Sequence, residues 1–248
     1  MKTPNKVKAI GALALMSALA ANLALAGNPN PNVLPPNSNP FGLSYAEWSV
    51  KWWQWVFSLP TTNSPILDTG DCSAGQSGHV RFLAGAFVPT TVTRACTIPA
   101  GTALFFPVVN GWADNTGCPY TTFTAQELAG FAASFVDAAG PVTCTIDGVA
   151  VAGISPAAGS AYRVGAQVFS YTLGPDNLIA NYFGPLFSVD LSCVTDGTFV
   201  SPAAEDGVYL MLAPLSAGSH TIHFTVEGLL DITYKITVAR SLSSSEQS

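Results

Sequence analysis

The feature of this sequence that most constrains its fold is a succession of short β-branched and aromatic runs separated by turn residues. Runs of this length and composition are typical of β-strands. The clearest hairpin signal is Asp147-Gly148, which separates residues 142–146 from residues 149–151. We predict strand-forming segments at residues 79–88, 102–109, 142–153, 162–173, 186–193, 207–215, 220–228 and 231–239.

A helix is predicted ahead of these segments, at residues 45–58. Ser44 and Glu47 have the S-x-x-E spacing of a capping box, in which each side chain binds the backbone N–H of the other residue. Pro60 ends the helix, because proline disfavours a helical conformation in the residue before it.

A second helix is expected to interrupt the strands. Thr124 and Glu127 repeat the capping-box spacing, and Gly140-Pro141 stops the helical pattern. Between them, apolar residues recur at the spacing of one helix face, namely Leu128, Phe131 and Phe135.

Strands without regular strand–helix alternation favour antiparallel sheets packed face to face. The predicted fold class is therefore mainly β: an antiparallel β-sandwich or jelly roll with one N-terminal Trp-rich helix and one inserted helix. No polar linker divides residues 41–240, so we expect one domain there. The Asn- and Pro-rich residues 27–40 are expected to form an extended, solvated arm, and residues 241–248 a flexible tail.

Residues 1–26 have the features of a secretory signal peptide. Three lysines open the chain, an apolar stretch follows, and Ala24-Leu25-Ala26 forms a small-x-small cleavage signal. Cleavage after Ala26 predicts a protein that is secreted, periplasmic or on the cell surface. No later segment is long and apolar enough to predict a membrane span.

Charge is scarce and one-sided. Only 10% of the 248 residues are charged, against about 25% in ordinary globular proteins. The signal peptide carries three of the nine basic side chains and none of the fifteen acidic ones, so the mature chain has six against fifteen. Six basic side chains make no stripe for neutralising phosphates, which excludes nucleic acid as a partner.

All five cysteines lie in the mature chain, where an oxidising compartment favours disulfides. We predict a bond between Cys72 and Cys96, since each borders a strand-like run and the loop closes easily. Cys144 is expected to pair with either Cys118 or Cys193, which leaves one spare thiol.

Four tryptophans fall within the first predicted helix, on two stripes that cannot both face solvent. One interpretation is that the helix covers one side or end of the sandwich. The other is that a tryptophan at its rim, with Trp53 as the candidate, offers a platform to a sugar ring or another flat apolar ligand.

Residues 110–115 are expected to form a loop after the strand at 102–109. The loop collects amide, aromatic and carboxylate groups, and loops at the ends of a sandwich commonly carry ligand contacts. Asn110, Trp112 and Asp114 are therefore the best candidates for binding a ligand, and plain turn formation is the alternative interpretation.

Other candidate groups are weaker. His220 and His223 would lie on opposite faces of one strand, so we predict no metal site and no cofactor. Glu205 sits in what resembles an ordinary turn before a strand, and Asp68 in a loop. With Asp114, these carboxylates are the candidates for a catalytic role, although no spacing raises one above the others.

Four sequence blocks occur in order: YAEWSVKWWQWVFSLP, GQSGHVRFLAG, CTIPAGTALFFPVVN and PLSAGSHTIHF. Together they resemble a family of uncharacterised secreted bacterial proteins. The resemblance implies a β-rich single domain that carries a signal peptide, and it implies no activity, cofactor or catalytic residue.

The leading functional hypothesis is a secreted, non-enzymatic β-sandwich that binds a glycan or serves as a cell-surface or matrix component. Its partner would be a polysaccharide or a neighbouring cell-surface protein. One alternative is a secreted hydrolase or lyase that acts on a polysaccharide or polyester through loop carboxylates. Another is an adhesin or filament subunit that joins its neighbour by strand addition.

Overall fold

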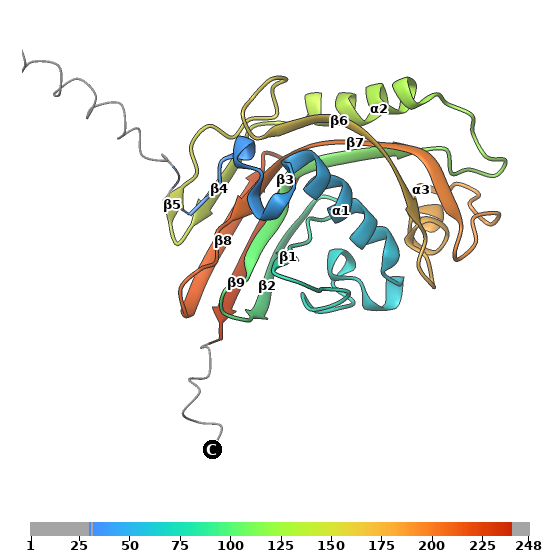
Figure 1. Ribbon diagram of the computed structural model, residues 1–248. Helices are drawn as coiled ribbons and strands as arrows, with labels where there is room; N and C mark the ends of the chain where they lie inside the picture. Colours follow the sequence, from blue (N-terminus) through green and yellow to red (C-terminus); the bar gives the residue numbers. More distant parts are fainter. Residues whose placement is uncertain (1–29, 31, 240–248) are drawn as a thin grey trace, which may run out of the picture.

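The computed structural model describes residue 30 and residues 32–239, which form two facing β-sheets with helices packed around them (Figure 1). The first sheet has the strand order β1-β3-β7-β6 and the second has the order β2-β9-β8-β4-β5. The strands are β1 Val80–Phe82, β2 Thr90–Ile98, β3 Ala103–Asp114, β4 Val142–Ile146, β5 Val149–Ala150, β6 Arg163–Thr172, β7 Phe199–Leu212, β8 Gly218–Val226 and β9 Leu230–Val238.

The helices are α1 Tyr45–Ser58, α2 Ala125–Asp137 and the short α3 Gly184–Phe187. Single helical turns occur at η1 Pro36–Ser38, η2 Pro40–Gly42, η3 Thr61–Asn63, η4 Pro65–Leu67 and η5 Ile179–Phe183. Both long helices begin at the predicted capping boxes. Each has the reciprocal pair of hydrogen bonds, between Ser44 and Glu47 in α1 and between Thr124 and Glu127 in α2.

The β-sandwich prediction is confirmed, with one difference in strand direction. Most neighbouring strands are antiparallel, but β1 pairs with β3 and β2 pairs with β9 in parallel, so both sheets are mixed. The chain leaves β1 in the first sheet, crosses to the second sheet as β2 and returns to the first as β3, so β1 and β3 are not joined by a hairpin. In the second sheet, β2 pairs with β9 along its full length. The hairpin at Asp147-Gly148 is confirmed, and it joins β4 to β5.

Two strand predictions were wrong. Strand β2 was not predicted, because its alternating threonines face outward on an edge strand and do not resemble an apolar run. Residues 186–193 were predicted to be a strand, but they begin within α3 and continue as turns. Pro185 lies in the first turn of that helix, where proline is favourable. The Asp190 carboxylate accepts hydrogen bonds from Ser192, which favours a turn over strand pairing.

Period-2 alternation along β3 and β7 divides the molecule into layers. Phe105 faces α1, where its ring meets that of Tyr45, whereas Phe106 faces the second sheet and stacks on Phe224 with ring centroids 5.4 Å apart. Helix α2 covers the far end of that second face, where Leu128 packs with Ala204 of β7. Helices α1 and α2 therefore lie on opposite faces of the first sheet (Figure 1).

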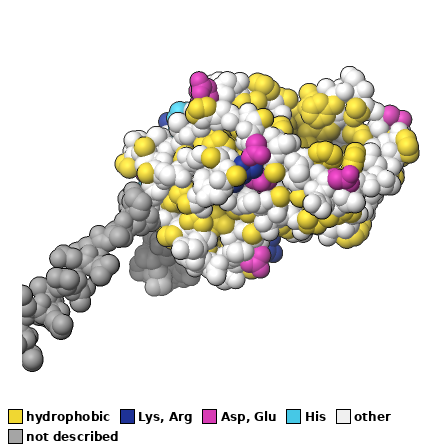
Figure 2. Space-filling model, turned by 90° about the horizontal axis from the view of Figure 1, so that it is seen from above, with side chains coloured by type: hydrophobic (Ala, Val, Ile, Leu, Met, Phe, Trp, Pro, Cys, Tyr) yellow, Lys and Arg dark blue, Asp and Glu magenta, His cyan; other side chains and the backbone are white. Residues whose placement is uncertain are grey.

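The apolar face of α2 differs from the expected one. Leu128 is buried as predicted, but its partners in the core are Ala132 and Val136. Phe131 and Phe135 lie at the rim of that face and are 47% and 55% exposed. In a view from above, hydrophobic side chains gather around a hollow and charged ones are few and scattered (Figure 2).

The predicted arm is not fully solvated. Among its described residues, Val33 is buried and forms a bridge with Leu212 at the end of β7. The buried Asn30 side chain donates a hydrogen bond to the hydroxyl of Tyr162. These contacts attach the arm to the first sheet. The predicted signal peptide, its cleavage site after Ala26 and the tail at 241–248 lie outside the described residues.

The disulfide prediction is confirmed for one pair and wrong for the other. Cys72 is bonded to Cys96, with Cα atoms 5.8 Å apart. Cys118 is bonded to Cys193, and Cys144 is the free thiol. Cys144 faces the core from β4, and burial raises the pKa of its thiol to about 12, so it stays protonated and unreactive. Two disulfides fit an oxidising compartment.

Among the described residues, no helix is long and apolar enough to cross a membrane.

Candidate functional site

Glu205 was predicted to lie in a turn, but it and its neighbour Asp206 lie inside β7. The prediction was wrong because β7 begins at Phe199 and carries both residues between α1 and α2. Their side chains point to opposite faces of the sheet, and the two residues are 0% and 2% exposed. Buried carboxyl groups are costly unless they are neutral or paired, so each acid needs a local explanation.

On the α1 side, Glu205 meets the hydroxyl groups of Ser49 and Tyr209. Tyr209 donates its hydroxyl hydrogen to Oε2 of Glu205 at 2.7 Å. Ser49 Oγ lies 2.6 Å from Oε1 of Glu205 and 2.8 Å from the carbonyl oxygen of Ala46. A serine hydroxyl has one hydrogen and a carbonyl can only accept, so donation to Ala46 requires the hydrogen between Ser49 and Glu205 to come from Glu205.

The raised pKa of Glu205 supports the same placement of the hydrogen on its carboxyl group. Burial is the largest influence on Glu205 and raises its pKa to about 8, although its hydrogen-bonded neighbours partly oppose the rise. Glu205 is therefore a neutral carboxylic acid at pH 7. Burial and the nearby Glu205 also raise the pKa of Tyr209, whose hydroxyl stays protonated.

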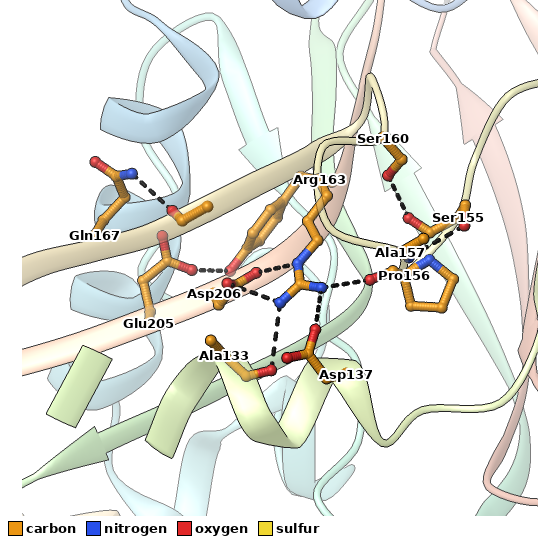
Figure 3. A network of polar contacts seen from close by, with 12 residues as sticks. Ala133, Asp137, Ser155, Pro156, Ala157, Ser160, Arg163, Gln167, Glu205 and Asp206 are labelled. Atoms are coloured by element: carbon orange, nitrogen blue, oxygen red, sulfur yellow. Dashed lines mark hydrogen bonds and ion pairs between the residues drawn. The ribbon is translucent and has the colours of Figure 1, made fainter. Parts of the chain in front are cut away.

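Asp206 meets a cation on the α2 side (Figure 3). Arg163 of β6 forms a two-pronged ion pair with it, at 2.8 Å from Nε to Oδ1 and 3.0 Å from Nη2 to Oδ2. The same guanidinium reaches Asp137 and the carbonyl oxygens of Ala133 and Pro156. The hydrogen bond to Asp206 is the main cause that raises the pKa of Arg163. This network joins α2 to the sheet.

A largely enclosed pocket of about 120 Å³ lies at the outer edge of β3, and we call it the β3-edge pocket. Its wall is mostly apolar and includes six aromatic side chains, and none of the described residues that line it is charged. The aromatic residues come from α1, the loop after β1, β3, α2, η5 and α3, namely Trp53, Phe87, Trp112, Phe135, Phe183 and Phe187.

The β3 edge is open here because β1 is only three residues long and its pairing ends at Phe105. Pro107 then lacks a backbone N–H, and the register of β3 shifts between Pro107 and Val109. Gly111 lets Phe135 approach, since a Cβ at Gly111 would lie 2.8 Å from its ring. The short strand, the proline and the glycine together create the pocket.

The structure brings together three of the four predicted ligand-binding residues. Trp53, Asn110 and Trp112 line the β3-edge pocket. Asp114 does not line it, but its Oδ2 accepts a hydrogen bond from Nε1 of Trp112 at 3.0 Å and so holds that ring. The loop prediction for residues 110–115 was wrong, because β3 continues through Asp114.

Asn110 links the pocket to the neutral acid. Its Nδ2 donates to the Tyr209 hydroxyl at 3.2 Å, and Nε1 of Trp53 donates to the same oxygen at 3.1 Å. Gly207 makes room for this contact, because a Cβ there would lie 2.6 Å from Tyr209 and 2.7 Å from Asn110. Sequence reasoning missed Tyr209, since nothing near it in the chain distinguishes it from an ordinary strand tyrosine.

The three candidate catalytic carboxylates lie apart. Asp68 pairs with Arg94 at 2.6 Å, on the loop after η4. Asp114 holds Trp112 and Tyr171, and Glu205 is buried under α1. None of them lines the β3-edge pocket, so the arrangement offers no pair of carboxylates to a ligand bound there.

The histidines also lie apart. His220 binds Asp147 at 2.7 Å, and His223 binds Asp231 at 2.9 Å. The described residues contain no group of three or more His, Cys, Asp or Glu side chains that would hold a metal ion.

Comparison of the chain with protein-family models, with curated proteins and with solved structures gave no match. The resemblance to secreted bacterial proteins therefore stays a prediction.

Proposed function

We propose that this protein is an exported, non-enzymatic binding protein that holds a small, neutral, ring-shaped ligand in the β3-edge pocket. The observation that carries the proposal is a largely enclosed apolar wall, rich in aromatic rings, whose described residues include one amide and no charged side chain. Ligand pockets commonly have this composition, an apolar lining with a few polar groups. The two disulfides support a place in an oxidising compartment.

The volume of the pocket limits the ligand. A cavity of about 150 Å³ in another protein holds benzene, so about 120 Å³ suits a single five- or six-membered ring. A sugar ring is a poorer fit, because its hydroxyl groups would meet an almost wholly apolar wall and stay unpaired.

The test is calorimetric titration of the purified mature protein with single-ring compounds, with tryptophan fluorescence as a second signal. Ala86→Phe would fill the pocket, since Ala86 lines it, and should weaken binding at least roughly tenfold. Ala150→Phe, on the exposed strand β5, is the matched control and should bind as the parent does. The proposal fails if no ring compound binds, or if Ala86→Phe binds as tightly as the control.

One observation favours glycan binding as a second candidate. Phe41 has a left-handed backbone (φ 56°) and is 48% exposed beside Trp48 in an open groove of about 690 Å³. An unusual backbone conformation of a bulky residue often marks a functional site, and exposed aromatic rings suit sugars. Retention on polysaccharide columns that is lost in Phe41→Ala, but kept in Ala86→Phe, would favour this groove over the pocket.

A further inference from the structure

Each side-chain nitrogen on the described wall of the β3-edge pocket already donates one hydrogen bond within the protein. Nε1 of Trp112 donates to Asp114, and Nε1 of Trp53 and Nδ2 of Asn110 both donate to Tyr209. A ligand that needs a donor from Trp53 or Trp112 would therefore have to break one of these bonds, because an indole has a single N–H. The Asn110 amide keeps its second hydrogen and its Oδ1, and Oδ1 is the side-chain acceptor on the described wall for which no hydrogen bond is found.

The orientation of the Asn110 amide follows from the neutral acid behind it. Because Ser49 gives its own hydrogen to Ala46, the neutral Glu205 donates to Ser49, and the other oxygen of Glu205 accepts the hydroxyl hydrogen of Tyr209. The Tyr209 oxygen then has only lone pairs to offer, and it can be met only by donors. If the Asn110 amide were flipped, its Oδ1 would face the Tyr209 oxygen, and neither atom would have a hydrogen to donate. The amide therefore keeps Nδ2 toward Tyr209 and leaves Oδ1 as the free acceptor.

We propose that the β3-edge pocket selects neutral rings that carry an N–H or O–H donor, and that Asn110 Oδ1 accepts the hydrogen of that donor. This inference rests on the proposed binding function and specifies its ligand class. Tyr209 and Glu205 act as positioning residues, because they fix the direction of the amide without lining the pocket.

Sites that hydrogen-bond a ligand discriminate strongly against isosteres that lack the matching group, because a buried polar atom is then left unpaired. Three ring compounds of similar size, which differ in their hydrogen-bonding groups, test this selectivity. Pyrrole offers a donor, thiophene offers neither donor nor acceptor, and pyridine offers only an acceptor. We expect pyrrole to bind roughly tenfold more tightly than thiophene, and pyridine to bind least tightly of the three.

The experiment is calorimetric titration of the full mature protein with these three probes. Asn110→Leu removes the acceptor with little change in volume, so pyrrole and thiophene should then bind equally. Tyr209→Phe removes the oxygen that orients the amide and should reduce the pyrrole preference while thiophene still binds. The comparison of probes on the unmodified protein needs no variant, so it remains decisive if a variant does not fold.

The outcomes separate this inference from the proposed function. Equal binding of pyrrole, thiophene and pyridine would overturn the donor selectivity and leave the ring-binding function standing. Tightest binding of pyridine would overturn the orientation of Asn110. If none of the probes and no other ring compound binds, the proposed function fails, and the selectivity fails with it.

Discussion

The two faces of the first sheet bury neighbouring acids in opposite ways. On the α1 face, Glu205 is surrounded by the hydroxyls of Ser49 and Tyr209 and is neutral. On the α2 face, Asp206 is held by both arms of Arg163. The residues are adjacent in the chain and equally buried, so the difference comes from what each face supplies.

The comparison shows that burial alone does not set the role of a carboxyl group. A face without a cation favours the protonated acid, which can donate a hydrogen and so order the hydroxyls and amides around it. A face with a guanidinium favours the ion pair, which ties separate elements together. Here the neutral acid lies behind the β3-edge pocket, and the ion pair lies between β6, β7 and α2.

The largest expected effect comes from removing the cation of the α2 face. Arg163→Met leaves Asp206 buried without a partner, and we expect a loss of about 3 to 5 kcal/mol in the free energy of unfolding. Urea unfolding followed by circular dichroism measures it. Arg163→Met combined with Asp206→Leu should recover most of the loss, because no buried charge then remains.

A matched control is Asp137→Asn, which removes the charge of a second, largely exposed partner of Arg163. It should cost less than about 1 kcal/mol. If Asp137→Asn and Arg163→Met cost the same, the pair with Asp206 is not what stabilises this face.

A smaller effect is expected in the pH dependence of the free energy of unfolding, through Glu205 on the α1 face. The pKa of Glu205 is raised in the folded protein, so the folded state holds a proton that the unfolded state releases above about pH 4.5. Stability from this group is complete at low pH and falls as pH rises toward about 8. The slope is about 1.4 kcal/mol per pH unit, or roughly 3 kcal/mol between pH 5 and 7.

Glu205→Gln isolates this contribution, because glutamine reproduces the donor and the acceptor of the neutral acid without titrating. Urea unfolding at several pH values should show the slope in the parent and a flatter profile in Glu205→Gln. Parallel profiles for the two proteins would contradict a neutral Glu205. The comparison with the same variant also cancels the titration of His220, whose pKa is raised chiefly by its hydrogen bond to Asp147.

The smallest effect on stability is expected at the N-terminal ends of α1 and α2. Here the two faces are alike, because both helices begin with a capping box. Ser44→Ala and Thr124→Ala each remove the side-chain acceptor of a capping box, and each should cost about 1 kcal/mol in thermal or urea unfolding. Ser134→Ala, within α2, should change stability by less than about 0.5 kcal/mol. A large difference between the two caps would mean that the faces differ in more than their buried polar groups.

The elements that were predictable have short-range causes. Both long helices follow from capping boxes, in which two residues three apart satisfy each other's backbone. The Asp147-Gly148 hairpin follows from two residues that accept positive φ. The bond between Cys72 and Cys96 closes a loop of modest length, so spacing was a useful guide to it.

The elements that were not predictable depend on distant partners. Strand β2 is stable because β9 lies beside it, and its own residues resemble a polar segment. Cys118 and Cys193 are 75 residues apart and meet only in the folded chain. Of the predicted ligand-binding residues, Trp53, Asn110 and Trp112 were chosen for their chemistry, and the fold brings them to one pocket.

The sequence by itself determined the β-rich sandwich, its two capped helices and the choice of aromatic and amide groups as candidate ligand contacts. These depend on hydrophobic periodicity and on the backbone needs of a few adjacent residues. Only the tertiary structure decided that Glu205 faces hydroxyls, that Asp206 faces Arg163, and that the β3 edge stays open. The physical reason is that a strand sends neighbouring side chains to opposite faces, and what covers each face comes from elsewhere in the chain.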